Sequence, residues 1–323
     1  MNRTTSAPAE AMAFGQVVDS CPPVLILAFN RPDTAAEVIE SMRAVRPTRV
    51  FFAVDGARPG RAGEAEKVRE VRNLANRIDW SCDVQTLFRD RNLGCKIAVS
   101  EAITWFFSQV EAGIILEDDC VAHPSFFRFT KELLERYGQD ERIMMVSGNN
   151  FQSGTPRAAY SYYYSRYTHI WGWATWRRAW QLYDHRMTAW QELRQGGWLM
   201  DILGDARAVD CWTQIFDATH GERNTSWAYR WMYSAWIQNG LTVLPNANLV
   251  TNIGFGELAT HTVQNDSALA SLATSEMTFP LKHPPFVIRD ERADAYTQNN
   301  IFSTPPLWRR IGSRVRRTLM GRR

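Results

Sequence analysis

Three consecutive acidic residues, Glu117, Asp118 and Asp119, are the strongest chemical signal in the sequence. They directly follow the apolar run 113–116, which predicts a buried strand. Three carboxylates are costly to desolvate together, because like charges repel where the dielectric constant is low. A divalent cation that also binds phosphate would relieve this repulsion, and hard oxygen ligands select Mg²⁺ or Mn²⁺. The motif predicts a metal and phosphate site, with a solvated acidic turn as the alternative.

Polar residues stand at the ends of two other predicted strands. Asn30 and Arg31 end the first strand, and Asp55 and Gly56 end the second. An arginine can bind phosphate through two parallel hydrogen bonds, although most arginines are surface residues. An Asp-Gly pair is also common in ordinary turns. The stretch 89–96 combines basic residues with a glycine, and it suits either a diphosphate or a solvated loop.

Tryptophans cluster in the second half of the chain. Ten of the thirteen fall between Trp171 and Trp236, and the densest run is Trp-Gly-Trp-Ala-Thr-Trp at 171–176. Aromatic faces stack on sugar rings, and the indole N–H can donate a hydrogen bond. Trp173 is the tryptophan predicted to face a ligand. The alternative of a packed aromatic core stays open.

Strands alternate with helices over the first half of the chain, and this indicates an α/β fold with a mostly parallel sheet and helices on both faces. The predicted strands are 24–30, 49–55, 84–88, 113–116 and 143–146. Predicted helices lie between them, the clearest over 61–78, 96–110 and 123–137. Ligands of such sheets bind at the carboxyl ends of the strands, so the strand-end residues above are expected to be neighbours.

Length and composition set the outer limits. The chain has 323 residues, a formal net charge of +3 and 45% hydrophobic residues, as expected of a globular protein. Five cysteines without a C-x-x-C pair indicate reduced thiols and a cytoplasmic protein. No apolar run reaches the roughly 18 residues of a membrane span, and no secretory signal is recognised. We divide the chain into a loose leader (1–23), an α/β half (24–150), an aromatic-rich half of the same domain (151–300) and a basic tail (301–323).

The ordered motifs resemble those of nucleotide-sugar glycosyltransferases of the GT-A type, which have a Rossmann-like fold. The sequence is similar to bacterial proteins labelled HlpA-like ("hemolytic protein"), and more distantly to the N-acetylglucosaminyltransferase I family. The pieces that carry the resemblance run from about residue 24 to 262. They are VLILAFNR, VDG, GIILEDDCVAHPSFFRF, MVSGNN, HIWGWATW, SWAYRWMY and NIGFGELATH.

The resemblance implies a role for each matched residue. Asp119 would ligate the metal, and Asp55 and Gly56 would lie near the base of a UDP-sugar. Trp173 belongs to the loop that would lie beside the transferred sugar. The full set implied to bind the donor is Phe29, Asn30, Arg31, Asp55, Gly56, Lys96, Glu117, Asp118, Trp173 and His261.

The sequence departs from the family at the catalytic base. Related proteins carry an aspartate just after a tryptophan, but here Ala228 follows Trp227. Alanine cannot accept a proton, so inverting transfer from a UDP-sugar to a glycan or glycolipid is expected to be impaired. Upstream acids could supply the base instead, and the fallback candidates are Asp210, Asp217 and Glu222. The alternative is a catalytically silent protein that binds a sugar nucleotide or a glycan. A nucleotidyltransferase is disfavoured, because Asn30-Arg31-Pro32 replaces the expected glycine-rich loop.

The C-terminal tail carries the basic character of the chain. Residues 309–323 contain seven arginines and no acid. Trp308, Ile311, Val315 and Leu319 recur at helical spacing, which is typical of an amphipathic helix on an anionic membrane surface. We therefore predict a peripheral location on the inner face of a bacterial membrane, with a disordered extension as the alternative. No motif for nucleic-acid recognition accompanies the charge, so no nucleic-acid partner is expected.

Overall fold

The computed structural model describes residues 21–157, 159–254 and 272–302. His261 lies outside the described residues, and so do most of the predicted leader and nearly all of the predicted tail. The predictions made for those segments stay predictions.

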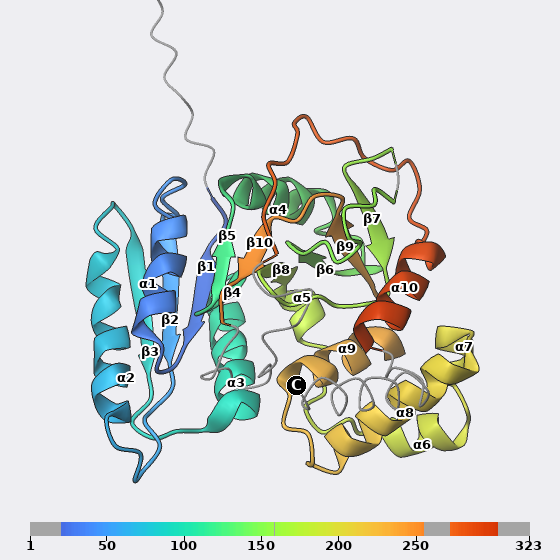
Figure 1. The fold of residues 1–323 in the computed structure, drawn as a ribbon, viewed down its shortest axis with the longest axis horizontal. Coiled ribbons are helices and arrows are strands. Elements are labelled where there is room, and N and C mark those ends of the chain that lie inside the picture. Colours follow the sequence, from blue (N-terminus) through green and yellow to red (C-terminus); the bar gives the residue numbers. More distant parts are fainter. Residues whose placement is uncertain (1–20, 158, 255–271, 303–323) are drawn as a thin grey trace, which may run out of the picture.

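A mixed sheet of eight strands runs through the described part of the chain in the order β3-β2-β1-β4-β8-β6-β9-β7 (Figure 1). Its strands are β1 (Val24–Ala28), β2 (Arg49–Val54), β3 (Asp83–Phe88), β4 (Ala112–Glu117), β6 (Ile143–Ser147), β7 (Tyr162–Ser165), β8 (Trp173–Trp176) and β9 (Leu241–Pro245). The block β3-β2-β1-β4 is parallel, as is the pair β6-β9, whereas β8 and β7 run antiparallel to their neighbours. A separate antiparallel pair joins β5 (Cys120–Ala122) to β10 (Val250–Asn252). The predicted fold class is confirmed.

Strand β1 shows why continuous apolar runs become central strands. Val24 and Ile26 pack into the core on one face of the sheet, and Leu25 and Leu27 pack on the other. Because side chains alternate along a strand, a strand buried on both faces must be apolar at every position.

Helices cover both faces of the sheet. One face packs against α1 (Pro32–Ser41), α2 (Glu64–Asn73) and α4 (Pro124–Arg136). The other packs against α3 (Gly94–Gln109), α5 (Arg177–Trp180) and α9 (Trp227–Ile237).

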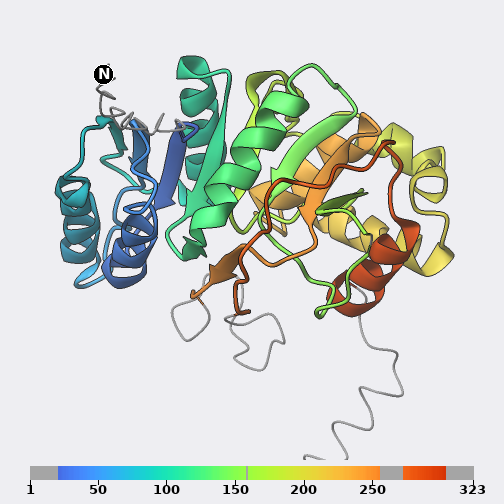
Figure 2. The ribbon, with the colours of Figure 1, turned by 90° about the horizontal axis from the view of Figure 1, so that it is seen from above.

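A third, helical cluster lies beyond the sheet. It is built around α6 (Trp190–Gln195), α7 (Leu199–Leu203) and α8 (Ala206–His220), with part of α9. Short helices complete the described chain: η1 (Leu74–Arg77), α10 (Glu291–Thr297) and η2 (Gln298–Phe302). Figures 1 and 2 both place α1 and α2 at one end of the molecule and α6–α8 at the other. No helix in the described ranges is long and apolar enough to span a membrane.

Strand β8 places the densest tryptophan run inside the core. It pairs with both β4 and β6, so that Trp173 lies opposite Ile115 on one side and Ser147 on the other. The Trp173 side chain is 0% exposed, and its ring centroid is 5.7 Å from that of Trp227 and 5.9 Å from that of Trp231. The expectation that Trp173 faces a ligand is therefore corrected to a core position.

The core position of Trp173 leads to a prediction about the stability of the protein. Replacing a buried tryptophan by alanine leaves a large cavity, so we expect Trp173→Ala to lower the free energy of unfolding by about 3–5 kcal/mol. Trp198→Ala is the matched control, because Trp198 is 57% exposed, and its effect should stay within about 0.5 kcal/mol. Urea unfolding measures both. A Trp173→Ala protein as stable as the wild type would contradict the core assignment.

Candidate functional site

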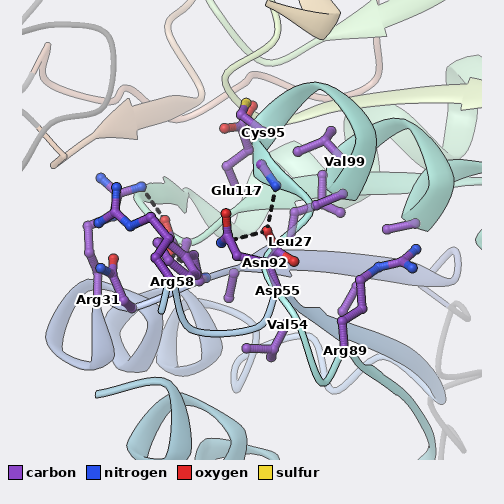
Figure 3. Close-up of a pocket in the computed structure, with 18 of the residues that line it drawn as sticks. Leu27, Arg31, Val54, Asp55, Arg58, Arg89, Asn92, Cys95, Val99 and Glu117 are labelled. Carbon is purple, nitrogen blue, oxygen red and sulfur yellow. Dashed lines mark hydrogen bonds and ion pairs between the residues drawn. The ribbon is translucent and has the colours of Figure 1, made fainter. Parts of the chain in front are cut away.

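A cavity of about 570 Å³ opens where strands β1, β2 and β4 end (Figure 3). Its apolar wall is formed by Leu27, Ala53, Val54, Ala98, Val99 and Ala102, from β1, β2 and α3. Its charged lining consists of the cations Arg31, Arg58, Lys67 and Arg89 and the acids Asp55, Glu117 and Asp118. The carboxyl edge of the parallel block thus gathers the strand-end residues that the sequence placed there.

The acid motif, residues 117–119, is organised by a single arginine. Arg31 follows β1, and its guanidinium forms ion pairs with Asp118 and, at 2.9 Å, with Asp119. The Phe29 main-chain N–H also donates to Asp118, at 3.1 Å. Residues 29–31 therefore hold the motif in place, which explains why the end of β1 and the end of β4 lie together.

Residues 252–254, which are distant in sequence, also contact the acid motif. The Asn252 side-chain amide at the end of β10 donates to Asp119 Oδ1 at 3.0 Å, and the Gly254 N–H donates to Asn252 Oδ1 at 2.8 Å. A Cβ atom on Gly254 would lie 2.1 Å from Asp119 Oδ2, so only glycine allows this close approach. Asn252 is a site residue that the sequence analysis did not identify.

Burial changes the acidity of the motif. Desolvation, reinforced by Asp119 and Asp118, raises the pKa of Glu117 to about 8. Desolvation also raises the pKa of Asp118, although Arg31 opposes the change. Glu117 Oε1 is buried and has no hydrogen-bond partner among the described residues. The motif as it stands is therefore short of positive charge and of hydrogen-bond donors.

Asp55 has a different task from the acid motif. Its carboxylate accepts hydrogen bonds from the Asn92 side chain and from the main-chain N–H groups of Gly56, Leu93 and Gly94, at 2.9 to 3.2 Å. These donors belong largely to the turn that starts α3, whose first N–H groups have no partner within the helix. Asp55 lines the cavity, as expected, but its oxygens are committed to tying β2 to α3.

Gly56 allows the same turn to approach β2. A Cβ atom at Gly56 would lie 2.3 Å from the carbonyl carbon of Arg91. Gly56 is thus a packing requirement of the turn, and this accounts for the Asp-Gly pair without any contact to a ligand.

The cationic side chains of the lining are mostly held by acids. Arg58 pairs with Glu64 and lies over the Phe29 ring at 5.4 Å, and the Asn30 side chain also donates to Glu64. Arg89 pairs with Glu101 at 2.9 Å. Figure 3 shows Arg31 and Arg58 on one side of the cavity and Arg89 on the other, so positive charge borders it at both ends.

Lys96 lies next to the cavity without lining it. Its Nζ atom is 2.6 Å from Glu222 Oε2, although its chain neighbour Cys95 belongs to the lining. Ala228, in the first turn of α9, packs against the α3 side of the core together with Cys95 and Val99.

Two of the fallback acids are directed elsewhere. Asp217 accepts a hydrogen bond from Trp190 at 3.0 Å and pairs with Arg194 at 3.1 Å, within the α6–α8 cluster. Asp210 is exposed on α8, and neither residue contributes to the cavity lining. Neither Asp210 nor Asp217 therefore lies at the cavity, because α8 packs in the helical cluster. The prediction that one of them is the base is corrected accordingly.

Several lining residues were missed by the sequence analysis. Arg58 and Lys67 precede or occupy a charged helix that looks like any solvated surface, and Thr225 sits in a turn without a motif. Asn92 lay inside the basic stretch 89–96, so that stretch was the available signal for the turn before α3.

The acid motif offers oxygen ligands of the kind that a divalent cation takes. Arg31 pairs with Asp118 and Asp119, and Glu117 Oε1 has no hydrogen-bond partner among the described residues. Within the described ranges, no group of three or more His, Cys, Asp or Glu side chains forms a metal site by itself. Mg²⁺ sites are commonly completed by substrate phosphates, and one carboxylate with phosphate oxygens suffices for such coordination.

No protein-family model and no curated protein matches this chain. Among solved structures, it is similar to HddC from Yersinia pseudotuberculosis, also solved in complex with GMP-PN, with a TM-score of 0.30, 11% identity, and 49% of this chain and 77% of that chain covered. It is also similar to a cytidylyltransferase from Leptospira borgpetersenii, with a TM-score of 0.31, 12% identity, and 50% and 63% covered. Similarities this low carry no argument about the activity of this chain.

Asp55 yields a stability prediction. Asp55→Asn places an amide group among N–H donors that need an acceptor, so we expect it to lower the free energy of unfolding by about 1–3 kcal/mol. Asp90→Asn is the control, because Asp90 is an exposed acid close to the same turn. The comparison is made by urea unfolding, and equal stability of the two variants would rule out the proposed tie between β2 and α3.

A second prediction concerns pH and the loop that leads into β8. His169 is buried against Phe151, with ring centroids 4.6 Å apart, and its Nε2 has no partner among the described residues. Burial lowers the pKa of His169 to about 3. The unfolded chain binds a proton near pH 6.5 and the folded chain does not, so stability falls as pH decreases below about 6.5.

Between pH 7 and pH 5, this histidine should cost the wild type about 2 kcal/mol of unfolding free energy. His169→Gln should lose that part of the pH dependence, whatever its stability at pH 7. The measurement is urea unfolding at both pH values. An identical change for both proteins would show that the pKa of His169 is the same in the folded and unfolded states.

Proposed function

We propose that this protein binds a nucleotide-sugar donor, with a UDP-sugar as the leading candidate, and transfers the sugar to a glycan or glycolipid hydroxyl. The observation that carries the proposal is the cavity at the carboxyl ends of β1, β2 and β4, lined by Glu117 and Asp118 and by cationic side chains. Resemblance of the sequence motifs to GT-A glycosyltransferases supports the same reading.

The cavity has the chemistry that such a donor needs. Its volume of about 570 Å³ lies within the range of roughly 300–1,000 Å³ typical of small-molecule sites. The apolar wall along α3 suits the flat face of a base. Four lining cations, Arg31, Arg58, Lys67 and Arg89, suit a diphosphate, because anions are stabilised by fixed positive charge in a partly desolvated site.

We further propose that Asp119 holds Mn²⁺ or Mg²⁺ together with the donor diphosphate. When bound, such an ion neutralises charge on the leaving phosphate. Arg31 keeps Asp118 and Asp119 oriented, and Glu117 Oε1, which has no partner among the described residues, would accept a hydrogen bond from a hydroxyl of the sugar or ribose. The Phe29 ring lies under the Arg58 guanidinium, and Asn30 donates to Glu64, the partner of Arg58, so both position Arg58 in the lining.

Ala228 favours a second function, a catalytically silent protein that binds a sugar nucleotide. Both functions require donor binding, and only the first requires turnover. Attachment of the predicted tail to an anionic membrane stays a prediction in either case.

Donor binding is tested by thermal unfolding with UDP, GDP and CDP, each with Mn²⁺ or with EDTA. A ligand at 100 times its Kd stabilises the folded state by about 2.7 kcal/mol, which raises the unfolding midpoint by several degrees. We expect UDP with Mn²⁺ to give the largest increase. Asp119→Asn should weaken UDP binding at least about tenfold with Mn²⁺.

Asp90→Asn serves again as the control, because it changes an exposed acid by the same atom exchange. If no nucleotide raises the midpoint, the cavity is not a donor site. If UDP binds equally well with EDTA, the assignment of a metal to Asp119 fails while donor binding stands.

A further inference from the structure

The reaction proposed above needs a group that accepts the proton of the attacking hydroxyl. Most acids near the cavity are committed to other partners. Asp55 receives hydrogen bonds from the turn before α3, and Asp118 and Asp119 share Arg31. Asp55, Asp118 and Asp119 are also at most 8% exposed, so their carboxylates are not open to an acceptor.

Glu222 lies on the turn between α8 and α9, and this turn reaches the cavity through Thr225. Its backbone adopts a φ of 59°, a left-handed conformation that redirects the chain away from α8. Its side chain extends to Lys96 on α3, between the lining residues Cys95 and Ala98. Glu222 therefore lies next to the cavity without lining it, and its side chain is 56% exposed to solvent.

A buried arginine fixes the turn that carries Glu222. Arg230 on α9 is 1% exposed and donates to the carbonyl oxygens of Thr219 at 2.7 Å and Ser226 at 2.9 Å. It also pairs with Glu222 Oε1 at 3.1 Å. Because Arg230 and Ala228 share the start of α9, this contact links Glu222 to the position where a base is missing. Figure 1 shows α9 beside α3, the two helices between which the turn is held.

We propose that Glu222 supplies the carboxylate that Ala228 lacks, and that it acts as the general base on the acceptor hydroxyl. This inference rests on the proposed glycosyltransferase function. In the step, the hydroxyl oxygen bonds to the anomeric carbon while the bond from that carbon to the phosphate oxygen breaks. The electron pair of the broken bond leaves with the nucleoside diphosphate, and the hydroxyl proton passes to Glu222.

The partners of Glu222 suit this role. The hydrogen bond from Lys96, helped by the charge of Arg230, lowers the pKa of Glu222, so its carboxylate is ionised at neutral pH. Each carboxylate oxygen keeps a further lone pair beyond these contacts. Lys96 and Arg230 also limit its rotamers, which is the positioning that a base requires.

The test compares wild type, Glu222→Gln, Glu222→Gln with Ala228→Asp, and the control Asp210→Asn. UDP release from UDP-glucose, UDP-galactose and UDP-N-acetylglucosamine is measured with water as the hydroxyl, and UDP affinity is measured by calorimetry. Glu222→Gln should reduce UDP release at least about 100-fold with less than about threefold change in UDP affinity. Adding Ala228→Asp should recover at least about tenfold, and Asp210→Asn should match the wild type.

Affinity and turnover separate the two proposals. A wild-type protein that does not bind UDP would remove the proposed function, and the assignment of Glu222 with it. Wild-type affinity with full turnover in Glu222→Gln would overturn the assignment of Glu222 alone. A wild type that binds UDP but releases none from the three donors would remove the transfer function and the assignment of Glu222 together, and would favour the silent binding protein. A Glu222→Gln protein whose loss of turnover is matched by lost affinity would overturn the assignment of Glu222 alone.

Discussion

The ion pairs between Arg31 and the two aspartates Asp118 and Asp119 are the contact on which the site depends. Three adjacent carboxyl groups at the end of a buried strand repel one another, and a structure that places them there must compensate that charge. Arg31 does so from the end of β1, the strand that pairs with β4. The register of that pairing therefore fixes both the charge balance and the shape of the cavity mouth. Asn252 and Gly254 are drawn to the same point from β10, although they lie more than a hundred residues away in sequence.

The opposite wall of the cavity depends on a second acid used in another way. The Asp55 carboxylate accepts hydrogen bonds from the turn that begins α3, and these bonds hold the helix to the end of β2. The same turn closes over Gly56, where no side chain could fit. The start of α3 is thus held to the end of β2 by hydrogen bonds, next to the cavity. Asp55 and the acid motif both follow strands of the sheet, but their roles differ because their surroundings differ.

Much of this arrangement could be read from the sequence, because apolar runs such as 24–28 have only one place in an α/β sheet. The acid motif, Asn30, Arg31 and Asp55 were found because they end such strands. Strand β8 was not found, since its tryptophans allow stacking on a ligand as well as packing in a core. Only its insertion between β4 and β6 decides between the two. Asn252 and Thr225 were out of reach for a similar reason, because tertiary contacts alone bring them to the site.

The polar groups around the cavity differ in how many of their hydrogen-bonding positions are filled. Asp55 and the buried Arg230 use their capacity on the main chain, as scaffolding groups do. Glu117 Oε1 has no partner among the described residues, although such isolation inside a protein costs free energy. Glu117 lines the cavity, so a polar ligand that donates to this oxygen would recover that cost.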